Sequence, residues 1–496
     1  MSTDWVSRAT DLRPSVSSLV GDAWLEGSGT AFSKFGPRDG QLLSQFAGVS
    51  AEELERTVRT AREAFDDGRW SNLSVQSRKR TLTNLADLIE KNLSELALLE
   101  CLDVGKPIRS ALDFDVPEAA ATIRYCAEAA DKLHSKVFAA DQSSFSYQLR
   151  RPRGVMGGII GWNFPLLLAA AKVGPALATG NCIILKPSEI TPFSATKLAA
   201  LALEAGVPEG VLNVVHGGAS VGESLVRHSG VDLVTFTGST ATGRAMLRAL
   251  GESSMKPMIL ECGGKAPNIV FDDCPNLDAV ADAVIARAFW NQGQVCTASS
   301  RLLIQRAIMQ PLLDRIVQRA ANLPLGDPLH EDTRFGALVS RGHRDKVLGY
   351  ISESVKSGIE TAYRSDRPAP NKTGFYVAPT IFSPVSTHHR IAQEEIFGPV
   401  LSVIPFDSEA DAVAIANGTM YGLSAIVWTK SMSRAQRIAN QIKAGLVTIN
   451  AVESPLGGPA SGVLSVEGHG QSGLGIEGGI DGMESYLSKT AVQMFF

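Results

Sequence analysis

Short apolar runs alternate with helical segments between residues 155 and 238, and this alternation constrains the fold more than any other feature. The runs VMGGIIG, NCIILKP, VLNVVHG and DLVTFTG have the length of buried strands. The segments between them carry apolar residues at helical spacing. Strands that alternate with helices form a mostly parallel sheet, with ligands near the carboxyl ends of the strands. The sequence therefore predicts an α/β fold.

Two segments outside this stretch predict a different kind of strand. Residues 144–150, SFSYQLR, alternate apolar and polar side chains, and the final AVQMFF is also strand-like. Such strands must be paired or covered, so we expect them to form an oligomerisation arm. The helical spacing elsewhere predicts helices over residues 51–66, 77–92, 169–178 and 194–205.

Composition and charge exclude several classes of protein. The chain has 496 residues, 44% of them hydrophobic, which indicates a globular protein rather than a disordered one. A net charge of −4 without a basic cluster disfavours nucleic-acid binding and a polybasic membrane anchor. Six scattered cysteines with no CxxC pair, and no HExxH, indicate reduced thiols and no metal site. The polar start lacks the apolar core of a signal peptide, so we expect a soluble cytoplasmic protein.

Cys296 and Glu261 have settings that suit covalent catalysis. Cys296 lies in FWNQGQVCTASS, a polar, glycine-bearing loop in which a thiol could act as a nucleophile. An inert buried cysteine is the common alternative. Glu261 follows the apolar run MIL and precedes two glycines, a position that raises the proton affinity of a carboxylate and suits a general base. A salt-bridged carboxylate fits that position equally well.

Two motifs after predicted strands could hold parts of a nucleotide. Gly238 and Gly243 in TFTGSTATG stand where a strand turns into a helix, which suits a phosphate but also an ordinary tight turn. Lys186 and Glu189 in LKPSE could hold a ribose or form a solvated turn.

A further motif supports a different class of enzyme. GASVG, residues 218–222, follows a predicted strand and matches the GxSxG nucleophile elbow. A serine hydrolase that uses Ser220 would also need a histidine and an acid in position. A serine hydrolase is therefore the alternative hypothesis from a different class of enzyme.

Six motifs together identify the chain as a member of the aldehyde dehydrogenase superfamily. In the family's order they are WNFP (162–165), KPSE (186–189), FTGS (236–239), ECGGK (261–265), NQGQVC (291–296) and EEIFGP (394–399). The resemblance implies two Rossmann-like α/β domains and a bridging β oligomerisation arm, in a homodimer or homotetramer. The implied boundaries are 1–133 with 153–262 for the NAD-binding domain, 263–477 for the catalytic domain, and 134–152 with 478–496 for the arm.

The resemblance also implies NAD-dependent oxidation of an aldehyde to a carboxylate. Cys296 matches the nucleophile that forms a thiohemiacetal and then a thioester. Asn163 matches the side-chain amide of the oxyanion hole, Glu261 the base that activates the hydrolytic water, and Lys172 a supporting residue. The presence of Glu261 favours hydrolysis over transfer to coenzyme A, which is the alternative within the class.

The resemblance implies two sets of binding residues. Because a carboxylate at Glu189 repels a 2′-phosphate, we expect NAD rather than NADP. The implied cofactor contacts are Ile160, Trp162, Asn163, Lys186, Ser188, Glu189, Gly218, Gly222, Phe236, Gly238, Ser239, Glu261, Glu395 and Phe397. The implied substrate pocket consists of Phe164, Leu167, Ala171, Trp290, Val295, Thr297 and Val466.

The substrate is harder to infer than the reaction. LECGGK, DWVSRA and ECLDVGKPI resemble the γ-glutamyl-γ-aminobutyraldehyde dehydrogenases, which implies an ω-amino or γ-glutamyl-amino aldehyde. Ala171 stands where a tryptophan is common, which would open the substrate tunnel, and Trp290 replaces a usual phenylalanine and would fill part of it. Residues 454–476 depart from the family pattern. Their Glu467 and His469 could favour a cationic substrate or could simply be solvated.

Overall fold

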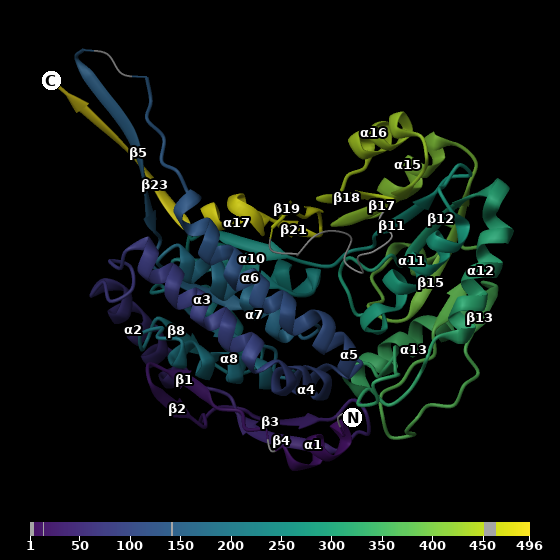
Figure 1. Ribbon diagram of the computed structural model, residues 1–496, viewed down its shortest axis with the longest axis horizontal. Helices are drawn as coiled ribbons and strands as arrows, with labels where there is room; N and C mark the ends of the chain where they lie inside the picture. Colours follow the sequence, from purple (N-terminus) through teal and green to yellow (C-terminus); the bar gives the residue numbers. More distant parts are fainter. Residues whose placement is uncertain (1–3, 13, 140–141, 451–462) are drawn as a thin grey trace.

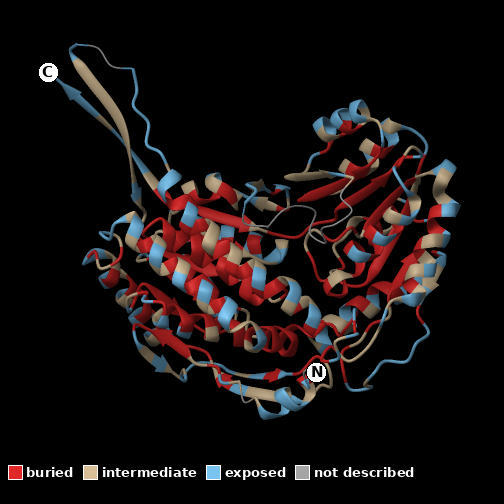
Figure 2. Ribbon diagram, in the orientation of Figure 1, coloured by how far each residue is buried: buried red, intermediate tan, exposed pale blue. Residues whose placement is uncertain are grey.

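The computed structural model describes residues 4–12, 14–139, 142–450 and 463–496. Two α/β units lie side by side, and a two-stranded arm projects from the first of them (Figure 1). Buried residues are concentrated in the two sheets and in the helices next to them (Figure 2). Of the atypical segment 454–476, residues 454–462 lie outside the described residues.

The first unit is built on an eight-stranded sheet with the order β2-β1-β8-β7-β6-β9-β10-β21. Its five parallel strands are β6 (Val155–Ile159), β7 (Cys182–Lys186), β8 (Leu212–Val214), β9 (Leu233–Thr237) and β10 (Met258–Glu261). The antiparallel edges are β1 (Ser18–Val20), β2 (Ala23–Leu25) and β21 (Gly473–Leu474). From β6 the chain runs through β7 and β8 on one side and then continues at β9 on the other. Ligands of such sheets bind where this direction reverses, here beyond the carboxyl ends of β6 and β9.

The helices of the first unit follow the predicted pattern closely. Helix α2 (Ala51–Asp66) has the predicted limits because Ser50 and Glu53 form a capping box at its start. Helices α3 (Val75–Lys91) and α8 (Phe193–Glu204) begin within two residues of the predicted positions. Helix α7 (Pro165–Ala178) begins four residues earlier than predicted, since a proline is well tolerated in the first turn. No helix in the described part of the chain is long and apolar enough to cross a membrane.

The second unit repeats the strand order of the first. Its seven-stranded sheet has the order β13-β14-β15-β12-β11-β17-β18. The strands are β11 (Pro267–Val270), β12 (Arg301–Gln305), β13 (Thr361–Arg364), β14 (Thr380–Phe382), β15 (Val400–Phe406), β17 (Ser424–Trp428) and β18 (Leu446–Ile449). Around β11 the strand order β15-β12-β11-β17-β18 has the same arrangement as the order β8-β7-β6-β9-β10 around β6. All neighbouring strands are parallel except β13 and β14.

The projecting arm consists of the two strands that the sequence predicts outside the main sheets. Strand β5 (Ser144–Pro152) pairs antiparallel with β23 (Leu487–Phe495) along nine residues. The arm is half-buried or exposed along most of its length (Figure 2). At its end the side chains of Phe495 and Phe496 are 77% and 83% exposed, which leaves apolar surface uncovered in the single chain.

Candidate active site

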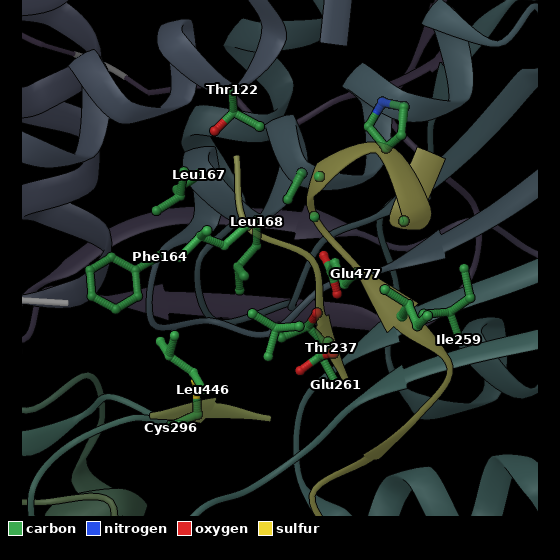
Figure 3. Close-up of a pocket in the computed structure, with 18 of the residues that line it drawn as sticks. Thr122, Phe164, Leu167, Leu168, Thr237, Ile259, Glu261, Cys296, Leu446 and Glu477 are labelled. Carbon is green, nitrogen blue, oxygen red and sulfur yellow. The ribbon is translucent and has the colours of Figure 1, made fainter. Parts of the chain in front are cut away.

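Cys296 lies in the walls of two cavities. The sheet-edge cavity, about 510 Å³, lies beyond the carboxyl ends of β6, β7 and β9 and includes Lys186, Ser239 and Glu395 in its wall. The helix cavity, about 240 Å³, lies among α6 (Val116–Ala129), α7 and α17 (Gly479–Ser485). Figure 3 shows Cys296, Glu261 and Glu477 at this second cavity. A half-buried thiol at the junction can therefore meet two different ligands at once.

The loop before Cys296 is fixed by polar side chains. Asn291 and Gln292 adopt left-handed backbone conformations, with φ of 46° and 58°. The Nδ2 atom of Asn291 donates to the carbonyl oxygen of Asn163 at 3.0 Å. The Nδ2 atom of Asn163 in turn donates to the carbonyl oxygen of Gln294 at 3.0 Å. The polar residues of NQGQVC thus hold the cysteine against the loop that follows β6.

Asn163 can act on a substrate as well as on this loop. A primary amide has two N–H donors, and the bond to Gln294 uses one of them. Asn163 and Cys296 both line the sheet-edge cavity, and Asn163 is 7% exposed. An amide donor held rigidly beside a nucleophile can stabilise an oxyanion that forms there.

Glu261 is the last residue of β10, and its side chain lines the helix cavity. Its Oε1 atom has no hydrogen-bond partner among the described residues. Burial and the nearby Glu477 raise the pKa of Glu261 well above its ordinary value, whereas Lys172 opposes this shift. The Nζ atom of Lys172 lies 2.6 Å from Oε2 of Glu477. The result is a carboxyl group of high proton affinity with one oxygen free to accept a proton.

Cys296 is held as a thiol by its surroundings. Burial, together with the carboxylates of Glu395 and Glu261, raises the pKa of Cys296 to about 12. Because the thiolate is the nucleophilic form, attack by this sulfur requires a base to take its proton. Glu261 lines the same cavity and has a pKa raised in the direction that a base requires.

One half of the sheet-edge cavity has groups suited to a phosphate and a ribose. Ser239 caps α10 (Thr240–Ser253), and its Oγ accepts a hydrogen bond from the backbone N–H of Thr242 at 3.2 Å. Gly238 has no room for a side chain, since a Cβ there would lie 2.5 Å from the Phe236 ring. The Nζ of Lys186 lies 3.7 Å from Oε2 of Glu189. A capped helix start attracts phosphate, and an acid beside a lysine can bind ribose hydroxyls.

The second unit supplies another part of the same cavity wall. The Oε1 atom of Glu395 accepts a hydrogen bond from the Gly264 N–H at 2.8 Å, which fixes the carboxylate. Phe397 has a left-handed backbone, with φ of 61°, and its carbonyl oxygen accepts from Nε2 of His343 at 2.6 Å. Its ring lies edge-on to that of Trp162, with centroids 5.1 Å apart. The two units therefore jointly form a cavity that fits an extended dinucleotide.

The structure brings most of the predicted residues to one of the two cavities. Those that line the sheet-edge cavity are Ile160, Trp162, Asn163, Lys186, Ser188, Glu189, Gly222, Phe236, Gly238, Ser239, Glu395 and Phe397. Those that line the helix cavity are Phe164, Leu167, Ala171, Glu261, Val295, Thr297 and Val466. Cys296 lines both.

Three predicted residues lie behind the described cavity walls. Lys172 is fully buried and acts on Glu261 through its pairing with Glu477. Gly218 caps α9 (Ala219–Arg227), where a Cβ would lie 3.3 Å from the Phe32 ring. Trp290 packs against Phe164, with centroids 5.2 Å apart, and so supports the substrate wall from outside.

Ser220 does not have the geometry of a nucleophile elbow. It lies exposed in the first turn of α9. A nucleophile elbow is a sharp, strained turn between strand and helix. Among the described residues, the non-glycine residues with positive φ are Asn291, Gln292, Phe397 and Asn450, and Ser220 is not one of them. The GASVG motif is instead an ordinary helix start beside the sheet-edge cavity.

Some residues of the site give no signal in the sequence. His343 and Lys346, from α13 (Arg341–Lys356), line the sheet-edge cavity. Thr122 and Glu477 line the helix cavity. His343 is one residue of an ordinary helix, and Glu477 lies in a glycine-rich stretch without periodicity. Only the packing of the two units brings these residues to the cavities.

Comparisons with known proteins identify the family and several relatives of this chain. The aldehyde dehydrogenase family model matches residues 24–492. Aminoacetaldehyde dehydrogenase of Pseudomonas aeruginosa is 43% identical over 436 residues, which is 87% of each chain. The NADP/NAD-dependent aldehyde dehydrogenase PuuC of Escherichia coli is 44% identical over 447 residues, 90% of this chain and 88% of that one. The solved structure of P. syringae AldA, an indole-3-acetaldehyde dehydrogenase in complex with NAD+ and IAA, has a TM-score of 0.95 at 41% identity over 99% of both chains.

Proposed function

Because this chain belongs to the aldehyde dehydrogenase family, we propose that Cys296, Asn163 and Glu261 carry out its oxidation of an aldehyde to a carboxylate. The enzyme is an NAD-dependent aldehyde dehydrogenase. The observation that carries the proposed roles is the position of Cys296 at the junction of a dinucleotide-sized cavity and an apolar one. At that junction the aldehyde carbon can contact the sulfur and the cofactor together.

The sheet-edge cavity fits NAD. The start of α10 and Ser239 would hold the pyrophosphate, Lys186 and Glu189 the adenosine ribose, and Glu395 the second ribose, beside Phe397. When bound, NAD supplies a hydride acceptor for the oxidation. Glu189 favours NAD over NADP, because its carboxylate would repel a 2′-phosphate.

The reaction begins with the thiol of Cys296. Its proton passes to Glu261 as the sulfur bonds to the aldehyde carbon, which gives a thiohemiacetal oxyanion. The Nδ2 of Asn163 and the backbone N–H of Cys296 donate to that oxygen and stabilise its charge. Because both donors belong to one fixed loop assembly, little reorganisation accompanies bond formation.

Hydrolysis of the thioester completes the reaction. Oxidation of the thiohemiacetal leaves an acyl group on Cys296. Glu261 first releases to solvent the proton that it took from Cys296. It then takes a proton from a water molecule, whose oxygen attacks the acyl carbon. The carbon–sulfur bond breaks, the product leaves as the carboxylate, one proton returns to the Cys296 sulfur and the other leaves to solvent. The free Oε1 of Glu261 suits this step, since it is a buried acceptor with no hydrogen-bond partner among the described residues. Lys172 and Glu477 would set the proton affinity of this base.

The domain organisation belongs to the same proposal. Residues 1–133 and 153–262 would form the NAD-binding domain, 263–477 the catalytic domain, and 134–152 with 478–496 the arm. Exposed apolar side chains at the end of the arm, Phe495 and Phe496, support its use in a homodimer or homotetramer. We propose that the assembly works in the cytoplasm, where its six free cysteines would stay reduced.

One experiment tests the catalytic assignment. Purified protein is mixed with NAD and a panel of aldehydes that includes amino aldehydes and an indolic aldehyde, the classes in the names of the relatives. Formation of reduced cofactor is followed by absorbance, with Cys296→Ala and the remote Cys274→Ala as a matched pair. We expect turnover that is lost in Cys296→Ala and kept in Cys274→Ala. Turnover that survives in Cys296→Ala would refute the assignment.

A further inference from the structure

The first turn of α7, directly after Asn163, is capped by a residue from another helix. Phe164 stands at the cap position, and its apolar side chain cannot accept a hydrogen bond from the first turn. The acceptor comes instead from α4 (Leu93–Val104), because Oε1 of Glu100 accepts the backbone N–H of Leu166 at 3.0 Å. This distant carboxylate therefore fixes the start of α7 and, with it, the segment that carries the proposed oxyanion donor.

Glu100 belongs to a buried group of three ionisable side chains, which we call the buried triad. The Nζ atom of Lys106 lies 3.7 Å from Oε2 of Glu100 and forms an ion pair with Asp115. All three residues are 0% exposed. Desolvation makes such a group a poor source of stability, since apolar side chains of similar volume often stabilise a core as well or better. The contacts of the triad therefore suggest a role other than stability.

Lys106 also contacts the segment that Glu100 fixes. Its Nζ atom lies over the face of the Phe164 ring, 4.1 Å from the centroid. A cation in this position is attracted by the ring, and more strongly where water is excluded. Phe164 follows Asn163 directly and lines the helix cavity together with Cys296. The buried triad thus holds this segment at two points, the backbone of α7 and the Phe164 ring.

A single turn of π-helix, Ala111–Asp115, brings the third member of the triad into place. Its last two residues contact different targets. Asp115 pairs with the lysine of the triad, whereas Phe114 packs edge-on against Trp290, with centroids 4.7 Å apart. Trp290 in turn packs against Phe164. Turns of π-helix are rare and are frequently found at functional sites, and this one supports Phe164 through both an ion pair and an aromatic contact.

From these contacts we propose that Lys106 is a positioning residue for the oxyanion hole: it holds the ring of Phe164 and, with Glu100, keeps the amide of Asn163 directed at the substrate oxygen. Lys106 touches no reacting atom, since it is fully buried and is not among the described residues that line either cavity. A donor stabilises an oxyanion best when its position is fixed before the reaction. This inference rests on the proposed function, because it presupposes the role of Asn163.

The first test removes the buried ion pair at nearly constant volume. In the double variant Lys106→Met with Asp115→Asn, the rate of the first turnover with NAD in excess should fall at least about tenfold, because a small misplacement of a catalytic group is costly. The dissociation constant of NAD, measured by protein fluorescence, should stay as in the native enzyme. Lys34→Met with Asp103→Asn removes another buried pair of the same unit, in which Nζ and Oδ1 lie 3.6 Å apart. This matched control should keep the native rate.

A double-mutant cycle shows whether Lys106 acts through Phe164. In Phe164→Leu the ring is absent, so the further change of Lys106 and Asp115 should lower the rate much less than it does in the native enzyme. Multiplicative effects of the two changes on the rate would show that the lysine acts elsewhere and would overturn the proposal.

A second pair of variants keeps the test decisive if the double variant does not fold. Glu100→Gln keeps an acceptor for the Leu166 N–H, whereas Glu100→Met removes it. The first turnover should therefore be slower in Glu100→Met than in Glu100→Gln, and equal rates would contradict the proposed route through α7.

The remaining outcomes separate this proposal from the function on which it rests. A native rate in the Lys106 and Asp115 variant would overturn the proposal. Weaker NAD binding in proportion to the loss of rate would do the same, since it would identify the triad as structural support for the whole unit. Oxidation of no aldehyde by the native enzyme, or a native rate in Asn163→Ala, would instead refute the proposed function.

Discussion

Lys172 and Glu477 form an ion pair of 2.6 Å beside Glu261, although 305 residues separate them in the chain. Lys172 is fully buried in α7, and Glu477 lies just before α17. The carboxylate of Glu477 raises the pKa of Glu261 in addition to the larger effect of burial, and the ammonium of Lys172 lowers it. The two members of the pair therefore have opposite effects on the pKa of Glu261, the assigned base.

Replacement of Glu477 should shift the pH dependence of turnover. Glu477→Gln removes the like charge and leaves Lys172 unopposed, so the pKa of Glu261 should fall. Because Glu261 works as a base in its ionised form, kcat rises with pH as it ionises, and this rise should move to lower pH. The measurement is kcat across the pH range, with the exposed Glu360→Gln as the control. A rise that moves to higher pH would contradict the assignment.

Asn163 should contribute to catalysis more than to the shape of its loop. Asn163→Ala removes an oxyanion donor and is expected to lower kcat about 10²- to 10³-fold. It also removes the bond to Gln294, so alkylation of Cys296 by iodoacetamide is measured as a separate readout. Asn291→Ala, which loosens the same loop without removing that donor, is the matched control. A fall in alkylation rate equal to the fall in kcat would indicate a positioning role instead.

Glu189 should determine the choice between the two nicotinamide cofactors. Glu189→Gln removes the repulsion toward a 2′-phosphate, and we expect the NADP-to-NAD ratio of kcat/KM to rise about tenfold. Glu204→Gln, exposed at the end of α8, provides the control. If the ratio in Glu189→Gln equals that of the native enzyme, this carboxylate does not discriminate between the cofactors.

Buried His216 should make the fold sensitive to acid. Burial, with a smaller effect of Lys186, lowers the pKa of His216 to about 3, and its Nε2 lies 2.9 Å from Oγ1 of Thr196. Below pH 6.5 the unfolded chain binds a proton at this residue that the folded chain excludes. The free energy of unfolding should therefore fall by up to about 1.4 kcal/mol per pH unit between pH 6.5 and 3 from this group alone.

The test of this effect is urea denaturation at several pH values. His216→Gln cannot take up the proton, so its stability should fall less steeply with pH than that of the native protein. His134→Gln, at an exposed position, should behave like the native protein. Equal slopes for His216→Gln and the native protein would exclude His216 as a source of acid sensitivity.

Local signals predict the framework of this protein well. The capping box of Ser50 and Glu53 fixes the start of α2, and the alternation of strands and helices gives the parallel sheet around β6. The motifs name Cys296 and Glu261 as catalytic; both line one cavity, and their roles stay a prediction. These successes share a cause, because each depends on residues that are close together in the sequence.

Features that depend on contacts between distant segments cannot be predicted from local sequence patterns. The pairing of Lys172 with Glu477 joins segments that no local pattern connects. Trp290 is expected in the substrate pocket; its ring packs against Phe164 and is absent from the described wall of the helix cavity, and no local pattern indicates this. The GASVG sequence matches the GxSxG pattern of a nucleophile elbow, whereas its backbone has the conformation of an ordinary helix start.

The repeated strand order of the two sheets has a consequence for ligand stoichiometry. In the second sheet the chain direction reverses between β11 and β17, where an open α/β sheet would also offer a crevice. There the Oγ1 of Thr429 donates to Asp273 at 2.8 Å, and Nη1 of Arg434 donates to the same carboxylate at 2.7 Å. These hydrogen bonds tie the two strand ends together, so we expect no ligand to bind between them. A titration should therefore find one dinucleotide bound per polypeptide, although the architecture contains the nucleotide-binding strand order twice.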